Sequence, residues 1–247
     1  TSTGNTVWWG NRTRRSERFA DGATGLQVER HRFDTQLLAM AAEAGSELQA
    51  DAVVRDVTLP PSHARPGPGP ATVRYSASDG TSHLVETNFI LDCSGRSGLI
   101  ARRGYRVRDA ARTTLAITGV WTRDTGWDIP DVTHTLVEAY DDGWAWSVPV
   151  SPSRRYVTVM VDPSLTKPDR RQEATTRYRA ELSKTAALGP MLKGAISEAA
   201  PCGCNASLYH ARRYSAPGLL LVGDAGSFID PISSYGVKKA LASAWLA

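Results

Sequence analysis

The feature that most constrains the fold is a short apolar run that ends in glycine and aspartate and precedes a helical pattern. Residues 218–222 are apolar throughout, which is typical of a central strand with both faces buried. Gly223 and Asp224 follow this run directly, and a helix is expected to begin near Ser234. Open α/β sheets bind ligands at the carboxyl ends of their strands. The run therefore predicts a strand–turn–helix corner that faces a ligand.

The turn after this strand carries residues suited to ligand contact. Asp224 can accept hydrogen bonds from ligand hydroxyls, and Gly226 lets the backbone approach a ligand closely. Pro231 fixes a turn, and Gly236 opens a helix whose free amides favour an anion by roughly 0.3 to 1 kcal/mol. The alternative is a tight corner in which Asp224 acts only as a cap.

The rest of the chain alternates between helical and strand patterns. Apolar spacings of three and four predict a helix over residues 33–44, ended by Gly45. Residues 11–24 are polar and rich in arginine and predict a surface loop, and residues 170–187 predict an exposed helix. Strand-like runs predict a three-stranded meander, at 52–59, 72–77 and 84–91, and a second, antiparallel sheet, at 114–121, 133–140, 144–150 and 156–161.

Composition limits the class of protein. A content of 41% hydrophobic and 22% charged residues is ordinary for a globular protein, and no apolar run approaches the roughly 18 residues of a membrane span, so we expect a cytoplasmic protein without membrane contact. The net charge of +4 is small and the arginine pairs have no aromatic interleaving, so we expect no nucleic-acid partner. The three cysteines fit neither a disulfide framework nor a zinc site, so we expect no metal.

Three segments resemble motifs of one flavoprotein superfamily, which includes FAD-dependent aromatic hydroxylases, geranylgeranyl reductases and flavin-dependent halogenases. Residues 222–236 read VGDAGSFIDPISSYG and are similar to its second flavin motif. Residues 30–38 read RHRFDTQLL and are similar to its R-x-x-F-D-x-x-L-L helix start. Residues 92–98 read DCSGRSG and are similar to a loop beside the adenosine half of the cofactor. The three motifs follow the superfamily's order.

The resemblance implies an FAD site at these motifs. In the superfamily, the aspartate equivalent to Asp224 binds the ribityl chain of FAD, and the arginine equivalent to Arg30 contacts the cofactor. Without the resemblance, each segment has an alternative interpretation. Arg30 is then a solvent-exposed arginine before a helix, and residues 94–98 form a flexible loop. The implied cofactor-binding positions are Arg30, Asp92, Gly95, Gly223, Asp224, Gly226, Pro231, Ser233, Gly236 and Val237.

A tryptophan pair points to a subtype. Residues 142–149 read DGWAWSVP and resemble the W-x-W-x-I-P signature of flavin-dependent halogenases. Trp144 and Trp146 would point to one face of a strand and form an aromatic wall, because side chains alternate. The resemblance implies that this wall separates flavin from substrate, which is the catalytic role expected of the pair. The alternative is a pair of core tryptophans, and related flavoproteins that do not halogenate carry a similar strand.

Departures from the halogenase pattern bear on the expected substrate and on the expected extent of the chain. The lysine with which halogenases hand over oxidised chlorine lies upstream of the residues present, and none of the lysines here matches it. Ser233 stands where tryptophan halogenases have a glutamate, which favours phenols, pyrroles, carrier-bound substrates or plain oxygenation over free tryptophan. The G-x-G-x-x-G fingerprint is absent, and the chain begins at Thr1 and ends within a helical pattern. We therefore expect an N-terminally truncated fragment.

The expected fold class is α/β, with an incomplete three-layer FAD/NAD(P)-binding domain at residues 1–108 and 215–247 and an inserted antiparallel β-sheet substrate domain at 109–214. The expected enzyme is halogenase-like. It acts on a small-molecule or carrier-bound aromatic through a flavin hydroperoxide, with chloride or bromide as co-substrate and a flavin reductase or NAD(P)H as reductant. The alternatives are an FAD-dependent monooxygenase of a small-molecule or protein-bound aromatic and a non-catalytic nucleotide-binding scaffold.

Overall fold

The chain divides into two compact units. The computed structural model describes residues 1–10, 13–60, 70–108, 113–165 and 174–247. Unit 1 comprises Thr1–Glu43 and Arg112–Ala206, and unit 2 comprises Ala44–Ala111 and Ser207–Ala247. The expected division keeps residues 1–108 together, whereas in the structure Thr1–Glu43 belong to the same unit as Arg112–Ala206. The expected boundary at 108/109 and the start of the expected helix at 170 lie at least partly outside the described residues.

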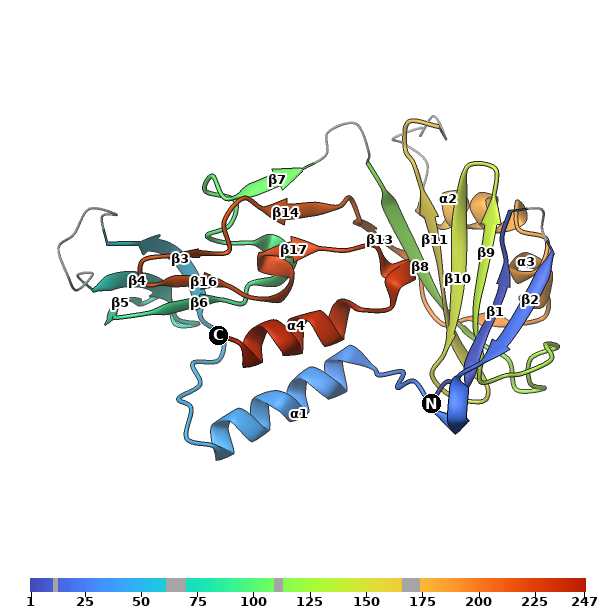
Figure 1. Cartoon of the computed structure of the whole chain (residues 1–247), viewed down its shortest axis with the longest axis horizontal. Coiled ribbons are helices and arrows are strands. Elements are labelled where there is room, and N and C mark those ends of the chain that lie inside the picture. Colours follow the sequence, from blue (N-terminus) through green and yellow to red (C-terminus); the bar gives the residue numbers. More distant parts are fainter. Residues whose placement is uncertain (11–12, 61–69, 109–112, 166–173) are drawn as a thin grey trace. The chain divides into compact units, whose positions relative to one another are not determined.

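The described part of unit 1 is built around one eight-stranded sheet (Figure 1). The strand order is β12-β8-β11-β10-β9-β1-β2, and β13 also pairs with β8. The four strands expected to form an antiparallel sheet, β8 to β11, pair antiparallel with one another, as predicted. Among the described pairs of this sheet, β1 with β9 is parallel and the others are antiparallel. The strands are β1 (Gly4–Trp8), β2 (Arg14–Arg18), β8 (Leu115–Thr122), β9 (Thr135–Tyr140), β10 (Gly143–Pro149), β11 (Arg154–Val161), β12 (Ile196–Ser197) and β13 (Cys202–Asn205).

The arginine-rich segment expected to be a loop contains an edge strand. β2 pairs antiparallel with β1, from Gly4 opposite Arg18 to Trp8 opposite Arg14, and all five of its residues are exposed. An edge strand of this kind is held by backbone hydrogen bonds without burying a face, so its sequence lacks the alternation that would predict it. The loop prediction for residues 11–24 is therefore wrong at β2, whereas Asn11 and Arg12 lie outside the described residues.

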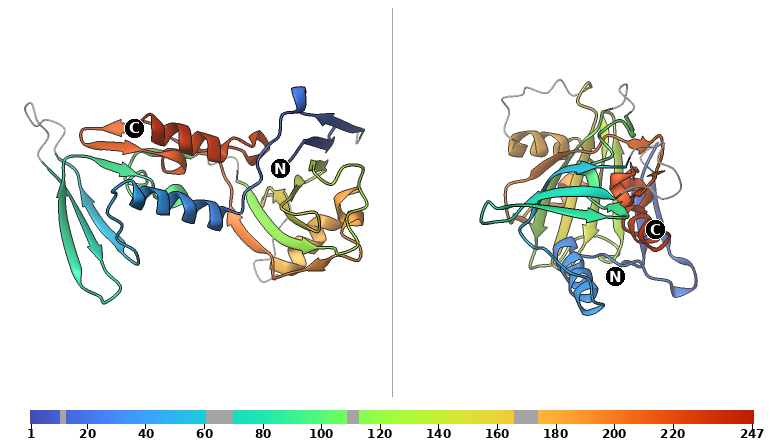
Figure 2. Two further views of the ribbon diagram at one scale, coloured as in Figure 1. Left: turned by 90° about the horizontal axis from the view of Figure 1, so that it is seen from below. Right: turned by 90° about the vertical axis from the view of Figure 1, so that its left-hand side faces the viewer.

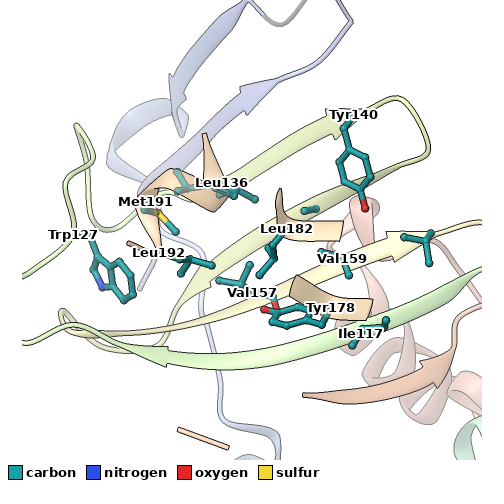
Figure 3. Packing of buried hydrophobic residues seen from close by; sticks show 13 residues of the cluster. Ile117, Trp127, Leu136, Tyr140, Val157, Val159, Tyr178, Leu182, Met191 and Leu192 are labelled. Carbon is teal, nitrogen blue, oxygen red and sulfur yellow. The ribbon is translucent and has the colours of Figure 1, made fainter. Parts of the chain in front are cut away.

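Helices α2 (Ala174–Ser183) and α3 (Leu188–Met191) cover one face of the sheet of unit 1 (Figure 2). Tyr178 and Leu182 of α2 are buried, and Figure 3 shows them over the strand residues of the cluster. The prediction of an exposed helix is therefore wrong for this face of α2. The buried cluster consists of Ile117, Trp127, Leu136, Tyr140, Ala145, Val157, Val159, Val161, Tyr178, Leu182, Leu188, Met191 and Leu192.

The position of α2 on the sheet is fixed by the hydroxyl of Tyr178. This hydroxyl donates to the carbonyl of Val157 at 2.8 Å and accepts from Nε1 of Trp121 at 3.0 Å. A Cβ atom on Gly119 would lie 2.8 Å from the same hydroxyl, so glycine leaves the space that the tyrosine fills. Burial raises the pKa of Tyr178 to about 12, because the charged form would lose its hydration.

Two buried charges of unit 1 bind backbone groups. The carboxylate of Glu138 accepts from the amides of residues 186–188, at 2.5 to 3.1 Å, and so caps the start of α3. The guanidinium of Arg155 donates to Oγ of Ser147 at 2.8 Å and to the carbonyls of Val132 and His134 at 2.8 and 2.6 Å. Burial lowers the pKa of Arg155 to about 10. Both groups therefore hold loops against the sheet.

Helix α1 (Arg30–Glu43) lies in unit 1 and confirms the predicted helix. Gly45 follows it with a φ of 95°, a conformation that favours glycine and ends the helix.

Unit 2 contains three three-stranded sheets within its described residues: β3-β4-β5, β15-β16-β6 and β17-β14-β7. The first is the predicted meander, but the run at 84–91 is divided between β5 and β6 in two different sheets. The strands are β3 (Val53–Thr58), β4 (Ala71–Ser76), β5 (Ser82–Thr87), β6 (Ile90–Asp92), β7 (Arg106–Arg108), β14 (Tyr209–Ala211), β15 (Ser215–Ala216), β16 (Leu219–Leu221) and β17 (Ser227–Phe228). The buried cluster is Val57, Ile100, Ala101, Ala211, Leu219 and Leu221.

Candidate functional site

Two of the segments singled out in the sequence end side by side in unit 2. β16 pairs parallel with β6, with Leu221 opposite Asp92, and the amide of Val222 donates to the carbonyl of Asp92 at 3.0 Å (Figure 1). Each strand then enters a 3-10 turn, η2 (Gly95–Ser97) after β6 and η3 (Gly223–Ala225) after β16. β16 lies between two neighbours, as predicted for a central strand. The carboxyl ends of two adjacent parallel strands thus form one edge, the position at which α/β sheets bind ligands.

The carboxylate of Asp92 organises the turn that follows β6. It is 5% exposed; one oxygen accepts from the amide and hydroxyl of Ser94 at 3.0 and 2.5 Å. The other accepts from the amides of Ile100 and Ala101 at 2.9 and 3.4 Å. Both oxygens are therefore engaged by the protein. A direct contact of Asp92 with a cofactor stays a prediction, and such a contact would have to share these donors.

The glycines of the site divide into two kinds. Gly223 has a φ of 59°, donates its amide to Oγ of Ser243 at 2.9 Å and packs against Ala240, while a Cβ on Gly226 would lie 2.8 Å from the ring of Tyr214. These two glycines allow the corner to pack. By contrast, a Cβ atom on Gly95 or Gly236 would meet no described heavy atom within 4 Å. Those two positions therefore offer bare backbone beside open space.

Asp224 lies in η3 and forms an ion pair within unit 2. Its Oδ1 accepts from Nζ of Lys239 at 3.0 Å, and its side chain is 31% exposed. Its backbone carbonyl accepts from the hydroxyl of Tyr209 at 2.7 Å. No group among the described residues bonds to Oδ2 of Asp224, so this oxygen can accept a hydrogen bond from a ligand hydroxyl. The capping role considered from the sequence is not observed, because no hydrogen bond from a backbone amide to the side chain of Asp224 is present among the described residues.

The segment after η3 leads into helix α4 (Gly236–Trp245). Turn η4 (Pro231–Ser233) starts with Asp230, whose Oδ1 accepts from the amide of Ile232 at 3.0 Å. Ser233 donates its hydroxyl to the carbonyl of Asp230 at 2.7 Å. No side chain in the described part of the chain caps the N-terminus of α4, where Gly236 and Val237 lie, so first-turn amides remain available to an anion there.

A stack of cations and aromatic rings joins the two turns. The guanidinium of Arg106 lies 3.8 Å from the ring centroid of Tyr209, the ring of Tyr209 stacks on Phe228, and Arg96 covers Phe228 at 5.0 Å. Arg106 also donates to the carbonyls of Arg96 and Ala225 at 2.9 and 3.5 Å, so it links η2 to η3. Burial lowers the pKa of Arg106.

Sequence reasoning missed three residues of this site: Arg106, Tyr209 and Lys239. Helical spacing could have indicated Lys239, because a residue three positions after Gly236 lies on the same side of a helix. Arg106 and Tyr209 come from strands that pair only in the folded unit, and no sequence signal joins them.

The remaining site predictions lie in unit 1. Trp144 and Trp146 point to the same face of β10, since Ala145 between them belongs to the cluster under the helices. Their rings stack with centroids 4.9 Å apart, and the ring of Trp9 lies 6.3 Å from that of Trp144. The aromatic wall expected from the sequence therefore exists as a geometric feature, on the face opposite α2 and α3. Its separation of flavin from substrate stays a prediction.

Arg30 is the first residue of α1. Its guanidinium donates to both carboxylate oxygens of Asp34, at 3.0 and 2.9 Å, and these hydrogen bonds lower the pKa of Asp34. Both side chains are largely exposed, so the pair is available to a ligand, and the predicted cofactor contact of Arg30 stays a prediction.

A cavity of about 430 Å³ lies on the helix-covered face of the sheet of unit 1. Its lining includes Leu136, Leu188 and Met191 of the buried cluster and the charged residues Arg14 and Lys193. It is therefore separated from Trp144 and Trp146 by the thickness of the sheet. Within the described ranges, no cluster of three or more His, Cys, Asp or Glu residues could hold a metal ion, and no helix is long and apolar enough to cross a bilayer.

Comparisons with known proteins found similar sequences and similar folds. A family model described as tryptophan halogenase matches residues 11–245. The flavin-dependent halogenase armH1 of Armillaria mellea is 30% identical over 87% of this chain and 44% of its own length, and the tryptophan 2-halogenase of Chondromyces crocatus is 31% identical over 90% and 42%. The flavin-dependent halogenase CmlS has a TM-score of 0.84 at 27% identity, covering 97% of this chain and 44% of that one. The chain thus spans less than half the length of these relatives, and the likenesses confirm the α/β class.

Proposed function

The chain belongs to the tryptophan halogenase family, and from this we propose that it is part of an FAD-dependent enzyme that halogenates an aromatic substrate. The observation that carries the proposal is the meeting of η2 and η3 at the ends of β6 and β16. Each turn belongs to a different family motif. The middle residues of the two turns, Arg96 and Asp224, are 128 residues apart in the sequence. Their proximity supports a single cofactor site.

The residues at this edge fit the chemical groups of FAD. Oδ2 of Asp224 offers an acceptor for ribityl hydroxyls, and the start of α4 offers amides for an anionic group. Gly95 and Gly236 give bare backbone where a ring or phosphate would need close approach. When bound and reduced, FAD supplies the electrons that activate oxygen for oxidation of a halide.

The chain's own residues take positioning roles in this proposal. Asp224 binds the ribityl hydroxyls, Arg30 contacts the sugar or phosphate, and Gly223, Gly226, Pro231 and Ser233 shape the turn. Asp92 acts through η2, because its oxygens hold that turn. Trp144 and Trp146 form the wall beside the substrate, which we propose to be an aromatic small molecule, free or bound to a carrier. A flavin reductase or NAD(P)H provides the reducing equivalents.

The first test is retention of FAD by the full-length protein. Asp224→Ala removes the acceptor for the ribityl hydroxyls, so FAD binding should weaken by about 1 to 3 kcal/mol, or roughly five- to 150-fold in Kd. Titration followed by quenching of flavin fluorescence measures this. Glu86→Ala is the control, because Glu86 is an exposed carboxylate of β5 in the same unit and should leave the Kd unchanged. Equal FAD affinity of Asp224→Ala and the wild type would refute the cofactor role.

The second test is the mass of the product. Full-length protein with reduced FAD, oxygen, bromide and a panel of phenols, pyrroles and indoles should yield a brominated product. Incorporation of oxygen alone would instead select the monooxygenase alternative. If the full-length protein binds no FAD, the result would instead favour the alternative of a non-catalytic nucleotide-binding scaffold.

A further inference from the structure

The ammonium of Lys239 is surrounded by acceptors from one turn. Lys239 lies in the first turn of α4, and its Nζ donates to Oδ1 of Asp224 at 3.0 Å, to the carbonyl of Gly223 at 3.5 Å and to the carbonyl of Ser227. Its side chain is only 16% exposed. An ammonium has three donors, and these three contacts use all of them.

These contacts fix both ends of η3 from the helix. Gly223 lies at the start of the turn and Ser227 beyond its end, so one side chain spans the whole turn. From other directions, Ser243 accepts from the amide of Gly223 and Tyr209 donates to the carbonyl of Asp224. The orientation of the Asp224 carboxylate is therefore set by its neighbours before any ligand is present.

Lys239 also cancels the charge of Asp224. FAD carries two phosphate groups, and an unpaired carboxylate in a partly buried site would repel them. The ion pair removes this repulsion and leaves Oδ2 of Asp224 as an acceptor, because Lys239 binds Oδ1. The neighbouring lysine differs: Nζ of Lys238 lies over the ring of Tyr235 at 5.1 Å.

We propose that Lys239 is a positioning residue for the cofactor, which sets FAD affinity by holding Asp224 with one oxygen bound and the other presented to the ligand. The inference rests on the proposed FAD site and adds to it a residue outside the motifs that define the site. Lys239 acts through Asp224, so its effect on binding must depend on the presence of the Asp224 charge.

The experiment compares variants of the full-length protein by FAD titration and by thermal unfolding without FAD. Lys239→Met should raise the Kd for FAD about tenfold or more. Lys239→Gln keeps a donor for the carbonyls of Gly223 and Ser227 without the charge, so its Kd should fall between those of the wild type and Lys239→Met. Lys238→Met is the matched control and should stay within about twofold of the wild type. If Lys239→Met does not fold, Lys239→Gln carries the comparison.

A double-mutant cycle with Asp224→Asn separates positioning from general stability. Lys239→Met should cost much less FAD affinity in the Asp224→Asn background than in the wild type, and amide exchange of residues 225 and 226 without FAD should accelerate in Lys239→Met. Equal costs in both backgrounds would show a merely structural role and overturn the inference. If the wild type binds FAD and both Lys239→Met and Lys239→Gln bind it with unchanged affinity, the role of Lys239 is overturned while the proposed function stands. If the wild type binds no FAD, the proposed function and the role of Lys239 are overturned together.

Discussion

The two units hold their polar groups in different ways. Unit 1 has strands of up to eight residues, such as β8 and β11, over a large buried cluster, whereas β15 and β17 of unit 2 have two residues each and its cluster has six members. Long strands in unit 1 fix the direction of a side chain by alternation, as for Trp144 and Trp146. In unit 2 the turns depend on individual charged side chains. A geometry fixed by a sheet should therefore resist single polar substitutions better than one fixed by Lys239 or Asp92.

The largest expected effect marks the limit of this comparison, because loop carbonyls of unit 1 depend on a single buried side chain, that of Arg155. Arg155→Ala removes the donors to Ser147 and to the carbonyls of Val132 and His134, which leaves buried acceptors unsatisfied. The free energy of unfolding should fall by about 3 to 5 kcal/mol. Urea unfolding followed by tryptophan fluorescence reports on unit 1, because all the tryptophans of this chain except Trp245 lie there.

The neighbouring arginine is the control for this substitution. Arg154 lies on the other face of β11, is 33% exposed and pairs with Glu29 and Glu198. Arg154→Ala should cost about 1 kcal/mol or less, as for other ion pairs near the surface. Similar losses for Arg154→Ala and Arg155→Ala would mean that burial does not decide the energetics of this sheet.

A smaller effect is expected from the ionisation of Tyr178. Its pKa is raised by burial to about 12, above the usual value near 10, so the unfolded chain loses the proton first. Stability from this group is complete below pH 10 and is lost as the pH rises towards 12, a fall of roughly 3 kcal/mol. Tyr178→Phe should flatten the dependence of unfolding free energy on pH between 10 and 12. Parallel curves for both proteins would contradict the burial of this hydroxyl.

The smallest effect on stability is expected at the site of unit 2. In Gly236→Ala the added methyl group lies more than 4 Å from every heavy atom of the described residues that could obstruct it. The free energy of unfolding should therefore change by no more than about 0.5 kcal/mol. The Kd for FAD should nevertheless rise severalfold if the ligand approaches this backbone. Gly203→Ala in β13 is the control in unit 1, where a Cβ has ordinary contacts near 4 Å, and it should alter neither quantity. If Gly236→Ala lowers the free energy of unfolding and leaves the Kd for FAD unchanged, Gly236 is needed for packing and not for ligand approach.

Local patterns predicted much of the fold. The apolar run at 218–222 predicted β16 because a central strand buries both faces, and the alternation at 144–150 predicted β10 with its paired tryptophans. β2 could not be predicted in this way, because an exposed edge strand has no buried face to leave a pattern. The buried face of α2 was recoverable, since Tyr178 and Leu182 lie four residues apart.

The candidate site was predictable only in part. Motifs indicated that residues 92–98 and 222–226 belong to one site, and the parallel pairing of β6 with β16 brings them together. The contacts that organise the turns were not predictable. Arg106 reaches Ala225, and Tyr209 reaches Asp224, only after several short strands have paired, and those pairings depend on the packing of the whole unit.

Near its two ends, the described part of the second segment of unit 1 forms adjacent strands. The amide of Ala206 donates to the carbonyl of Thr114 at 2.8 Å, and Asn205 pairs with Leu115 between β13 and β8. Once this segment has folded, Thr114 and Ala206 are held at hydrogen-bonding distance. The residues between them then act as a very short connection between the two segments of unit 2. For the polypeptide of unit 2, the interruption then costs little more entropy than a tight loop. A sheet domain with adjoining ends can thus be carried within another unit without separating the strands that must find each other.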